Sequence, residues 1–209
     1  MEIGPDLCRG FVLTGGKSSR MGQDKALLPF GGGPLALWVA GRVQAVCGRV
    51  SLVGDGSKYA GLGLPVIEDI YAGQGPLAGI HAALAHSDTP WSLVVGCDMP
   101  YLSSDFLGLL LEIAREGNFD AVVPESESFG YEPLCAVYTP ACRAPIEEAL
   151  QSHQRKTRDV FGRLCVRRVA RQEWQSYDPY GKLFRNMNTR EDYEQACSEL
   201  IGSLRSSSA

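Results

Sequence analysis

One stretch near the start of the chain limits most strongly what the chain can fold into. A short apolar run, residues 11–13, predicts a buried strand that ends just before two adjacent glycines, Gly15 and Gly16. The loop around and after these glycines carries three cations, Lys17, Arg20 and Lys25. Glycines let backbone N–H groups approach phosphate oxygens, and cations neutralise their charge. The stretch therefore predicts a phosphate-binding loop at the end of a buried strand.

The spacing of the glycines excludes two widespread phosphate loops. The dinucleotide-binding pattern Gly-x-Gly-x-x-Gly is absent, because Gly15 and Gly16 are adjacent and the next glycine is Gly22. A Walker A loop would end at residues 16–18, but its first glycine would then have to stand where Phe11 is. The loop therefore belongs to another class of phosphate-binding site.

Predicted strands and helices alternate through most of the chain. The strongest strand, residues 91–97, is nearly continuously apolar, as expected of a central parallel strand that is covered on both faces. The other predicted strands are residues 11–13, 49–54, 64–69, 120–124, 134–138, 165–170 and 183–187. Helices are predicted to begin near Pro34, after the glycine-rich loop of residues 73–79, at Ser103 or Ser104, and near Pro140, Thr157 and Thr189. This alternation predicts an α/β layered fold with a mostly parallel central sheet.

Length and composition narrow the class of protein further. The 209 residues suffice for one domain, which we predict to span residues 1–209 with an ordered core over residues 9–204. The net charge of -4 argues against nucleic acid as a partner, and no apolar stretch approaches the roughly 20 residues that cross a bilayer. The seven cysteines are odd in number and form no Cys-x-x-Cys pair, which favours reduced thiols and a cytoplasmic location.

Polar residues follow the predicted strands at the edge where ligands of such sheets bind. Asp98 directly follows the strongest strand, so its carboxylate is held rigidly opposite the cations of the glycine loop. Mg²⁺ takes few protein ligands and completes its shell with water and phosphate oxygens, which makes Asp98 a candidate magnesium ligand. Asp69 ends another strand, where its carboxylate could accept hydrogen bonds from ring N–H, amino or hydroxyl groups of a ligand.

Four motifs, in order along the chain, resemble those of the molybdenum cofactor guanylyltransferases, a group of MobA-like nucleotidyltransferases. They are Leu-x-Gly-Gly-x-x-x-Arg-Met-Gly-x-x-Lys at residues 13–25, Gly-Pro-Leu-Ala-Gly at 75–79, Cys-Asp-Met-Pro at 97–100 and Asn-x-Asn-Thr at 186–189. The resemblance extends from about residue 10 to about residue 194. It implies the Rossmann-like three-layer nucleotidyltransferase fold and transfer of GMP from GTP to molybdopterin that carries molybdenum, with release of pyrophosphate.

The resemblance also implies roles for single residues. The implied nucleotide-binding residues are Leu13, Thr14, Gly15, Gly16, Lys25, Asp69 and Asp98. The implied catalytic residues are Arg20, Lys25 and Asp98, of which Asp98 would hold Mg²⁺, with Mn²⁺ as the alternative cation. Acceptor binding and closure of the site are implied for Gly79, Asn186 and Asn188.

Parts of the chain leave alternatives open. The basic cluster of Arg155, Lys156 and Arg158 resembles a segment that binds the pterin phosphate, or it is a solvated basic turn. Residues 131–133 include Glu132 at a position where family members vary, and this loop is expected to face the acceptor. The implied partners are GTP, the molybdenum cofactor, and cofactor-insertion proteins or molybdoenzyme chaperones. The alternative functions are transfer from CTP, transfer to a sugar phosphate, and non-catalytic nucleotide binding by a regulator.

Overall fold

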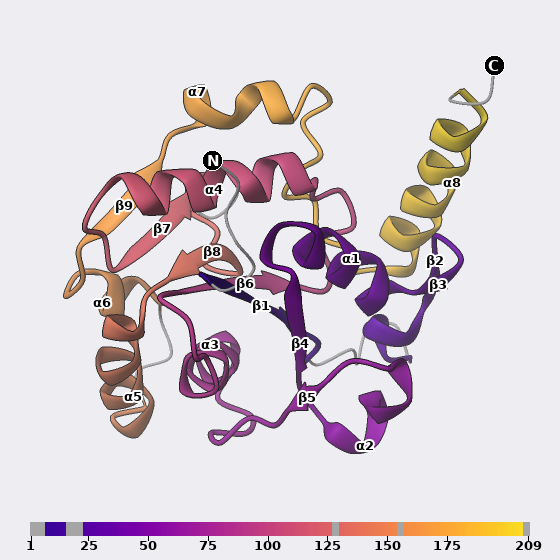
Figure 1. Ribbon diagram of the computed structural model, residues 1–209. Helices are drawn as coiled ribbons and strands as arrows, with labels where there is room; N and C mark the ends of the chain where they lie inside the picture. Colours follow the sequence, from indigo (N-terminus) through magenta and orange to yellow (C-terminus); the bar gives the residue numbers. More distant parts are fainter. Residues whose placement is uncertain (1–6, 16–22, 127–129, 154–156, 207–209) are drawn as a thin grey trace.

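A seven-stranded sheet forms the centre of the protein, with strand order β5-β4-β1-β6-β8-β7-β9. A computed structural model describes residues 7–15, 23–126, 130–153 and 157–206 (Figure 1). The strands are β1 (Cys8–Leu13), β4 (Arg49–Val53), β5 (Val66–Ile67), β6 (Trp91–Gly96), β7 (Ala121–Pro124), β8 (Cys135–Tyr138) and β9 (Val166–Val169). A separate antiparallel ribbon consists of β2 (Pro29–Phe30) and β3 (Gly33–Pro34). The predicted α/β architecture is confirmed.

Helices cover both faces of this sheet (Figure 1). One face packs against α1 (Leu35–Cys47), α4 (Ser104–Glu116) and the short α7 (Arg171–Trp174). The other face packs against α3 (Pro76–Ala85), α5 (Arg143–Gln151) and α6 (Thr157–Phe161). Two further helices are α2 (Gly56–Tyr59) and the C-terminal α8 (Arg190–Ser206). Neighbouring residues of β1 enter opposite cores, Val12 on the α1 side and Phe11 on the α3 side, because strand side chains alternate.

The strand directions bring most of the predicted site residues to one edge of the sheet. β1 pairs in parallel with β4 and β6, and β4 pairs in parallel with β5, so the carboxyl ends of these four strands meet there. β8 runs antiparallel to both β6 and β7, which places its beginning at the same edge. Residues that follow β6 are therefore neighbours of residues that precede β8, and residues that follow β1 and β5 lie further along the same carboxyl edge.

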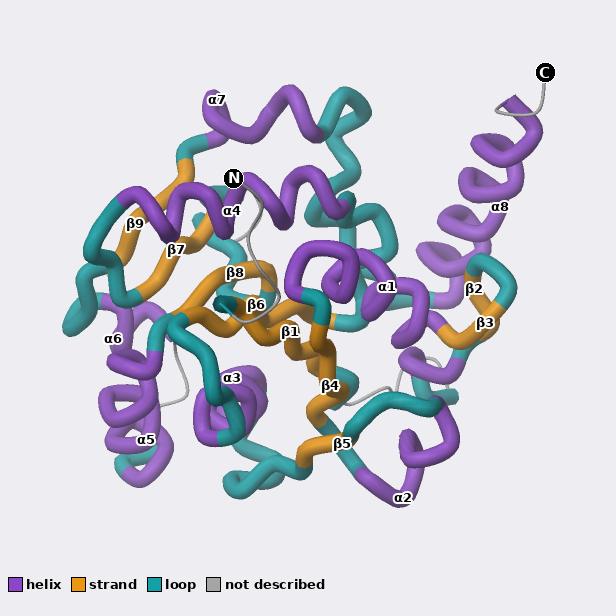
Figure 2. Tube along the Cα trace, in the orientation of Figure 1, coloured by secondary structure: helices purple, strands orange, loops and turns teal. Residues whose placement is uncertain are grey.

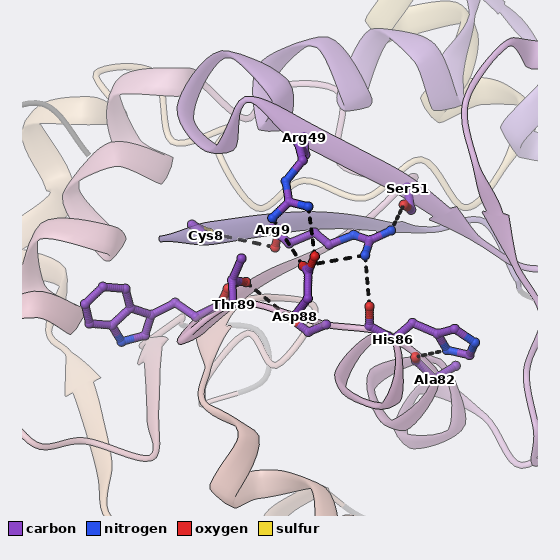
Figure 3. A network of polar contacts seen from close by, with 10 residues as sticks. Cys8, Arg9, Arg49, Ser51, Ala82, His86, Asp88 and Thr89 are labelled. Carbon is purple, nitrogen blue, oxygen red and sulfur yellow. Dashed lines mark hydrogen bonds and ion pairs between the residues drawn. The ribbon is translucent and has the colours of Figure 1, made fainter. Parts of the chain in front are cut away.

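A polar network lies at the opposite edge of the sheet from the carboxyl ends, where strands β1, β4 and β6 begin (Figure 3). Arg49 donates two hydrogen bonds to the carboxylate of Asp88, at 2.9 and 3.2 Å. Arg9 donates to the backbone carbonyl of His86 at 2.9 Å and to the hydroxyl of Ser51 at 3.1 Å. These bonds tie the connection between α3 and β6 to the first residues of β1 and β4, far from the carboxyl edge.

One predicted strand, residues 183–187, is wrong. The segment that leads into α8 is loop (Figure 2), although Leu183 and Met187 are both buried at 2% exposure. The backbone N–H of Met187 donates to the carbonyl of Asp98 at 2.9 Å, and the N–H of Arg185 donates to Lys182 at 2.9 Å. The apolar residues therefore anchor a loop against the end of β6 and do not extend the sheet.

Gly10 marks a close approach between β1 and α1. A Cβ atom at this position would lie 2.2 Å from Cγ1 of Val43 and 3.3 Å from the carbonyl oxygen of Arg49. We expect Gly10→Ala to lower the free energy of unfolding by about 1–3 kcal/mol, because the added methyl forces the helix away from the sheet. Urea denaturation measures this change.

The matched control for this variant is Gly41→Ala in α1, where an added Cβ would meet no atom within 4 Å. Alanine favours a helix interior over glycine, so this variant should be stabilised by up to about 1 kcal/mol. A Gly10→Ala protein as stable as the wild type would contradict the close packing of β1 on α1.

Candidate active site

Hydrogen bonds that continue just beyond the strands fix the predicted site residues at the carboxyl edge. The N–H of Cys97 donates to the carbonyl of Leu13 at 3.0 Å, and the N–H of Thr14 donates to the carbonyl of Val53 at 2.9 Å. Thr14 and Gly15 therefore continue β1 at this edge, and Asp98 comes one residue after Cys97. Gly15 is exposed, whereas Leu13 is 7% exposed and packs into the core on the α3 side.

Thr14 turns its side chain into the protein. Its hydroxyl donates to the carbonyl of Val53 at 2.9 Å, and the residue is 5% exposed. A Cβ atom at Gly54 would lie 2.3 Å from this hydroxyl oxygen and 2.9 Å from the ring of Tyr59. Thr14 and Gly54 are therefore complementary, since no side chain fits at position 54 while Thr14 occupies this space. A ligand would contact Thr14 through its backbone.

Lys25 is presented by a short 3₁₀ helix, η2 (Lys25–Leu27). Asp24 caps this helix, because its Oδ1 accepts a hydrogen bond from the N–H of Ala26 at 3.1 Å. The other carboxylate oxygen of Asp24 accepts a hydrogen bond from the hydroxyl of Tyr59 at 2.8 Å. Lys25 Nζ donates to Oδ1 of Asn188 at 2.9 Å. These contacts bring together two predicted site residues that are 163 positions apart.

Asp98 stands at the end of β6 with its carboxylate partly buried. Burial raises the pKa of Asp98 above its usual range, and the positive charge of Lys25 partly opposes this rise. A Cβ atom at Gly96 would lie 2.9 Å from Oδ1 of Asp98, so only glycine leaves room for the carboxylate in this position. A cation beside Asp98 would favour its ionised form.

The segment before α8 approaches from outside the sheet. Thr189 caps α8 by accepting a hydrogen bond from the N–H of Asp192 at 3.1 Å, while Asp192 Oδ2 accepts from the N–H of Thr189 at 2.8 Å. Asp192 Oδ2 also accepts from the N–H of Asn188 at 2.9 Å. This cap holds the Asn188 backbone, so that its side chain reaches Lys25.

Four buried side-chain oxygens without a hydrogen-bond partner gather around this edge among the described residues. They belong to Asp69, Gln74, Glu132 and Asn186. The other such atoms lie at the beginning of β6, within α3 and in α7, in Ser92, His81 and Trp174. Buried polar atoms are normally hydrogen-bonded, so unpartnered acceptors at one edge indicate where a ligand would bind. Burial also raises the pKa of Asp69.

Glycines shape the loop between β5 and α3. Gly75 has φ of 81°, in the left-handed region that favours glycine, and it immediately precedes α3. A Cβ atom at Gly79 would lie 3.0 Å from a methyl carbon of Leu13. Gly79 therefore lets α3 pack against the end of β1, and its predicted contact with the acceptor stays a prediction.

Several predicted residues lie outside the part of the chain that the structure describes. These are Gly16 and Arg20 of the glycine loop and Arg155 and Lys156 of the basic cluster, and the side chain of Arg158 is likewise not described. Gln74 belongs to no motif and was not predicted as a site residue, and the bond from Tyr59 to Asp24 joins segments that the sequence does not connect. Glu132 was expected to lie in a loop that faces the acceptor, and its burial beside the beginning of β8 was not predicted.

The described residues lack both a cluster of metal-binding side chains and a membrane-spanning helix. They contain no group of three or more His, Cys, Asp or Glu side chains arranged to hold a metal ion. Across the same residues, no helix has both the length and the apolar character that crossing a membrane requires.

Comparison with known proteins gives consistent results. Residues 10–169 match the MobA-like NTP transferase domain family. A probable molybdenum cofactor guanylyltransferase of Pelotomaculum thermopropionicum is 37% identical over 189 residues, which cover 90% of each chain. A molybdenum cofactor guanylyltransferase of Desulfosudis oleivorans is 32% identical and covers 91% of this chain and 95% of its own. The crystal structure of molybdopterin-guanine dinucleotide biosynthesis protein A from Archaeoglobus fulgidus superposes with a TM-score of 0.81 at 27% identity, covering 93% of this chain and 99% of its own.

Proposed function

The chain belongs to the family of MobA-like NTP transferase domains, and on this premise we propose that it transfers GMP from GTP to molybdenum-bearing molybdopterin and releases pyrophosphate. The structural observation that carries the proposal lies at the carboxyl edge of the sheet: Lys25 bonds to Asn188, and the preceding residue, Met187, bonds to the backbone of Asp98. Relatives that align over about nine-tenths of the chain and are named as molybdenum cofactor guanylyltransferases support this assignment.

The reaction needs positioning and charge stabilisation more than proton transfer. The acceptor is a terminal phosphate whose second pKa is about 6, so it is largely ionised near neutral pH and needs no general base. Lys25 would neutralise the charge that develops at the α-phosphate, and Asn188 would hold the ammonium group in place. In this proposal Gly15, Gly16 and Arg20 hold the triphosphate so that pyrophosphate leaves in line with the attacking oxygen.

Asp98 fits a divalent cation, and we assign Mg²⁺ to it. The carboxylate is partly buried at the end of a rigid strand, where burial disfavours its charge and a cation would restore it. When bound, the ion supplies charge neutralisation for phosphate oxygens. Mn²⁺ has similar ligand preferences and would serve as the experimental substitute.

Unpartnered acceptors favour guanine as the base. Oδ1 of Asp69 and Oε1 of Gln74 are buried without a hydrogen-bond partner on the same loop between β5 and α3. The guanine edge offers two adjacent donors, N1–H and the 2-amino group, which match two acceptors. Inosine keeps N1–H but lacks the 2-amino group. GTP and ITP therefore differ by one hydrogen bond at this loop.

We expect Asp69→Ala to lower kcat/KM for GTP more than for ITP, because the wild-type preference for GTP depends on a buried acceptor. The ratio of kcat/KM for GTP to kcat/KM for ITP should fall about tenfold, because the variant no longer offers the buried acceptor for one hydrogen bond. Pyrophosphate release with each nucleotide measures it. Equal losses for GTP and ITP would instead assign Asp69 to a donor that both nucleotides carry, either N1–H of the base or the ribose hydroxyls.

The direct test of the function uses the purified protein with magnesium, molybdenum-bearing molybdopterin and one nucleotide at a time. We expect pyrophosphate release with GTP and much less with CTP or UTP, and none when the acceptor is omitted. Faster turnover with CTP would overturn the guanine assignment. Calorimetry that shows GTP binding without turnover on any acceptor would favour the regulator instead.

We assign the reaction to the cytoplasm. All seven cysteines are free thiols in the structure, and five of them are buried in the core. Free thiols in this number are typical of proteins in a reducing compartment. The partners proposed beyond GTP and the molybdenum cofactor are cofactor-insertion proteins or molybdoenzyme chaperones, because the product must be delivered to an acceptor enzyme.

A further inference from the structure

Glu132 has the lowest exposed fraction of any acidic side chain that the structure describes, at 3%. Its backbone is fixed on both sides: its N–H donates to the carbonyl of Pro124 at 2.9 Å, and its carbonyl accepts from the N–H of Cys135 at 3.1 Å. The residue therefore stands in a rigid turn between β7 and β8. A carboxylate so deeply buried is rare unless a partner compensates its charge.

Hydrogen bonds and ion pairs within the described residues compensate the charge of the Glu132 carboxylate only in part. Glu132 forms a hydrogen bond with Ser126, but its Oε1 is buried without any hydrogen-bond partner. Among the described residues, the ion pairs do not include Glu132. Desolvation disfavours an ionised carboxylate in this position unless a cation offsets its charge.

The backbone segment that carries Glu132 lies beside the segment that carries Asp98. The carbonyl of Leu134 accepts the N–H of Gly96 at 2.8 Å, so the beginning of β8 lies beside the end of β6. The point where a Gly96 Cβ would stand is 2.9 Å from Oδ1 of Asp98 and 3.6 Å from Cβ of Leu134. Glu132 and Asp98 each lie two residues along the chain from this contact, which places both residues at the same junction of β6 and β8.

We propose that Glu132 is a second carboxylate ligand of the divalent cation assigned to Asp98, so that the end of β6 and the beginning of β8 hold the ion between them. This inference rests on the proposed function, which supplies the reason for a cation. A Mg²⁺ ion held by one or two carboxylates, with phosphate oxygens and water completing its shell, is the usual arrangement at phosphate-transfer sites. The unpartnered Oε1 of Glu132 is the atom offered to the ion.

A structural role and a metal-binding role of Glu132 predict opposite changes in the melting temperature of the metal-free protein when Glu132 is neutralised. If Glu132 stabilises the fold, Glu132→Gln should lower the melting temperature of the metal-free protein. If Glu132 binds the ion, the metal-free protein holds two neighbouring carboxylates that repel each other, and neutralising one should raise its melting temperature. The amide of glutamine keeps the size of the side chain and can still bond to Ser126.

The primary experiment titrates Mn²⁺ alone into the full-length protein and follows free Mn²⁺ by electron paramagnetic resonance. We expect Glu132→Gln to weaken Mn²⁺ binding about tenfold, because a divalent ion loses one charged ligand. Glu116→Gln removes the same charge from the exposed end of α4 and should bind Mn²⁺ as the wild type does. Equal affinity of Glu132→Gln and the wild type, or no Mn²⁺ binding by the wild type, would overturn the proposal.

Thermal unfolding with and without MgCl₂ supplies the second measurement. We expect Glu132→Gln to melt higher than the wild type without metal and to lose most of the stabilisation that MgCl₂ gives the wild type. A variant that melts lower, or fails to fold, while the wild type shows no metal-dependent shift would assign a structural role and overturn the proposal. The GTP assay of the wild type reports separately on the proposed function, so either conclusion can fail alone.

Discussion

Replacing Asp98 by alanine is expected to slow GMP transfer by about three orders of magnitude while GTP binding changes little. The carboxylate stands at the end of β6, and the backbone carbonyl of the same residue accepts a hydrogen bond from Met187. The substitution removes the carboxylate but leaves this backbone bond, so the loop before α8 should stay in place. Without the cation that Asp98 would hold, the variant neutralises the charge of the reacting phosphates less well than the wild type does. This loss affects the transition state more than the bound ground state, so the rate falls while GTP affinity is kept.

Single-turnover pyrophosphate release measures the rate, and calorimetry measures GTP affinity in the same preparations. Asp88→Ala is the control, because this carboxylate belongs to the polar network at the opposite edge of the sheet and should leave the rate at the wild-type level (Figure 3). An Asp98→Ala protein that turns over like the wild type would exclude Asp98 from the reaction. Loss of GTP binding together with activity would instead assign Asp98 mainly to substrate affinity.

Much of this arrangement was predictable from the sequence, because it follows from local patterns. An apolar run predicts a strand, glycines predict the loop after it, and parallel strands place their carboxyl ends together. Asp69 and Asp98 could therefore be assigned to one edge before any contact was known. The capping role of Thr189 was equally local, since the pattern Thr-x-x-Asp supplies both halves of the reciprocal cap.

What sequence could not predict depends on contacts between distant segments. The apolar pattern of residues 183–187 is as compatible with an anchored loop as with a strand, and the bond from Met187 to Asp98 decides between them. The fit of Thr14 against Gly54 joins two positions that are far apart in the sequence. The burial of Glu132 follows from the antiparallel direction of β8, which periodicity does not reveal.

Lys25 should have the second large effect. We expect Lys25→Met, which keeps an aliphatic chain of similar length, to lower kcat by about two orders of magnitude. The ammonium group is delivered by the capped η2 helix and held by Asn188, so its position is defined before substrate binds. Removing it withdraws positive charge from the reacting phosphates. A parallel loss in kcat and kcat/KM, with little change in GTP affinity, would show that the interaction acts in the transition state.

Asn188 offers a way to test how Lys25 is positioned. Asn188→Ala removes the acceptor 2.9 Å from Lys25 Nζ but leaves the backbone bond to Asp192 intact. We expect a loss of about tenfold in kcat, because the lysine keeps its charge and loses its orientation. If Asn188 acts only through Lys25, adding Asn188→Ala to Lys25→Met should cause no further loss. Multiplicative losses in the double variant would mean that Asn188 contacts the substrate independently, as a ligand of the acceptor or the metal.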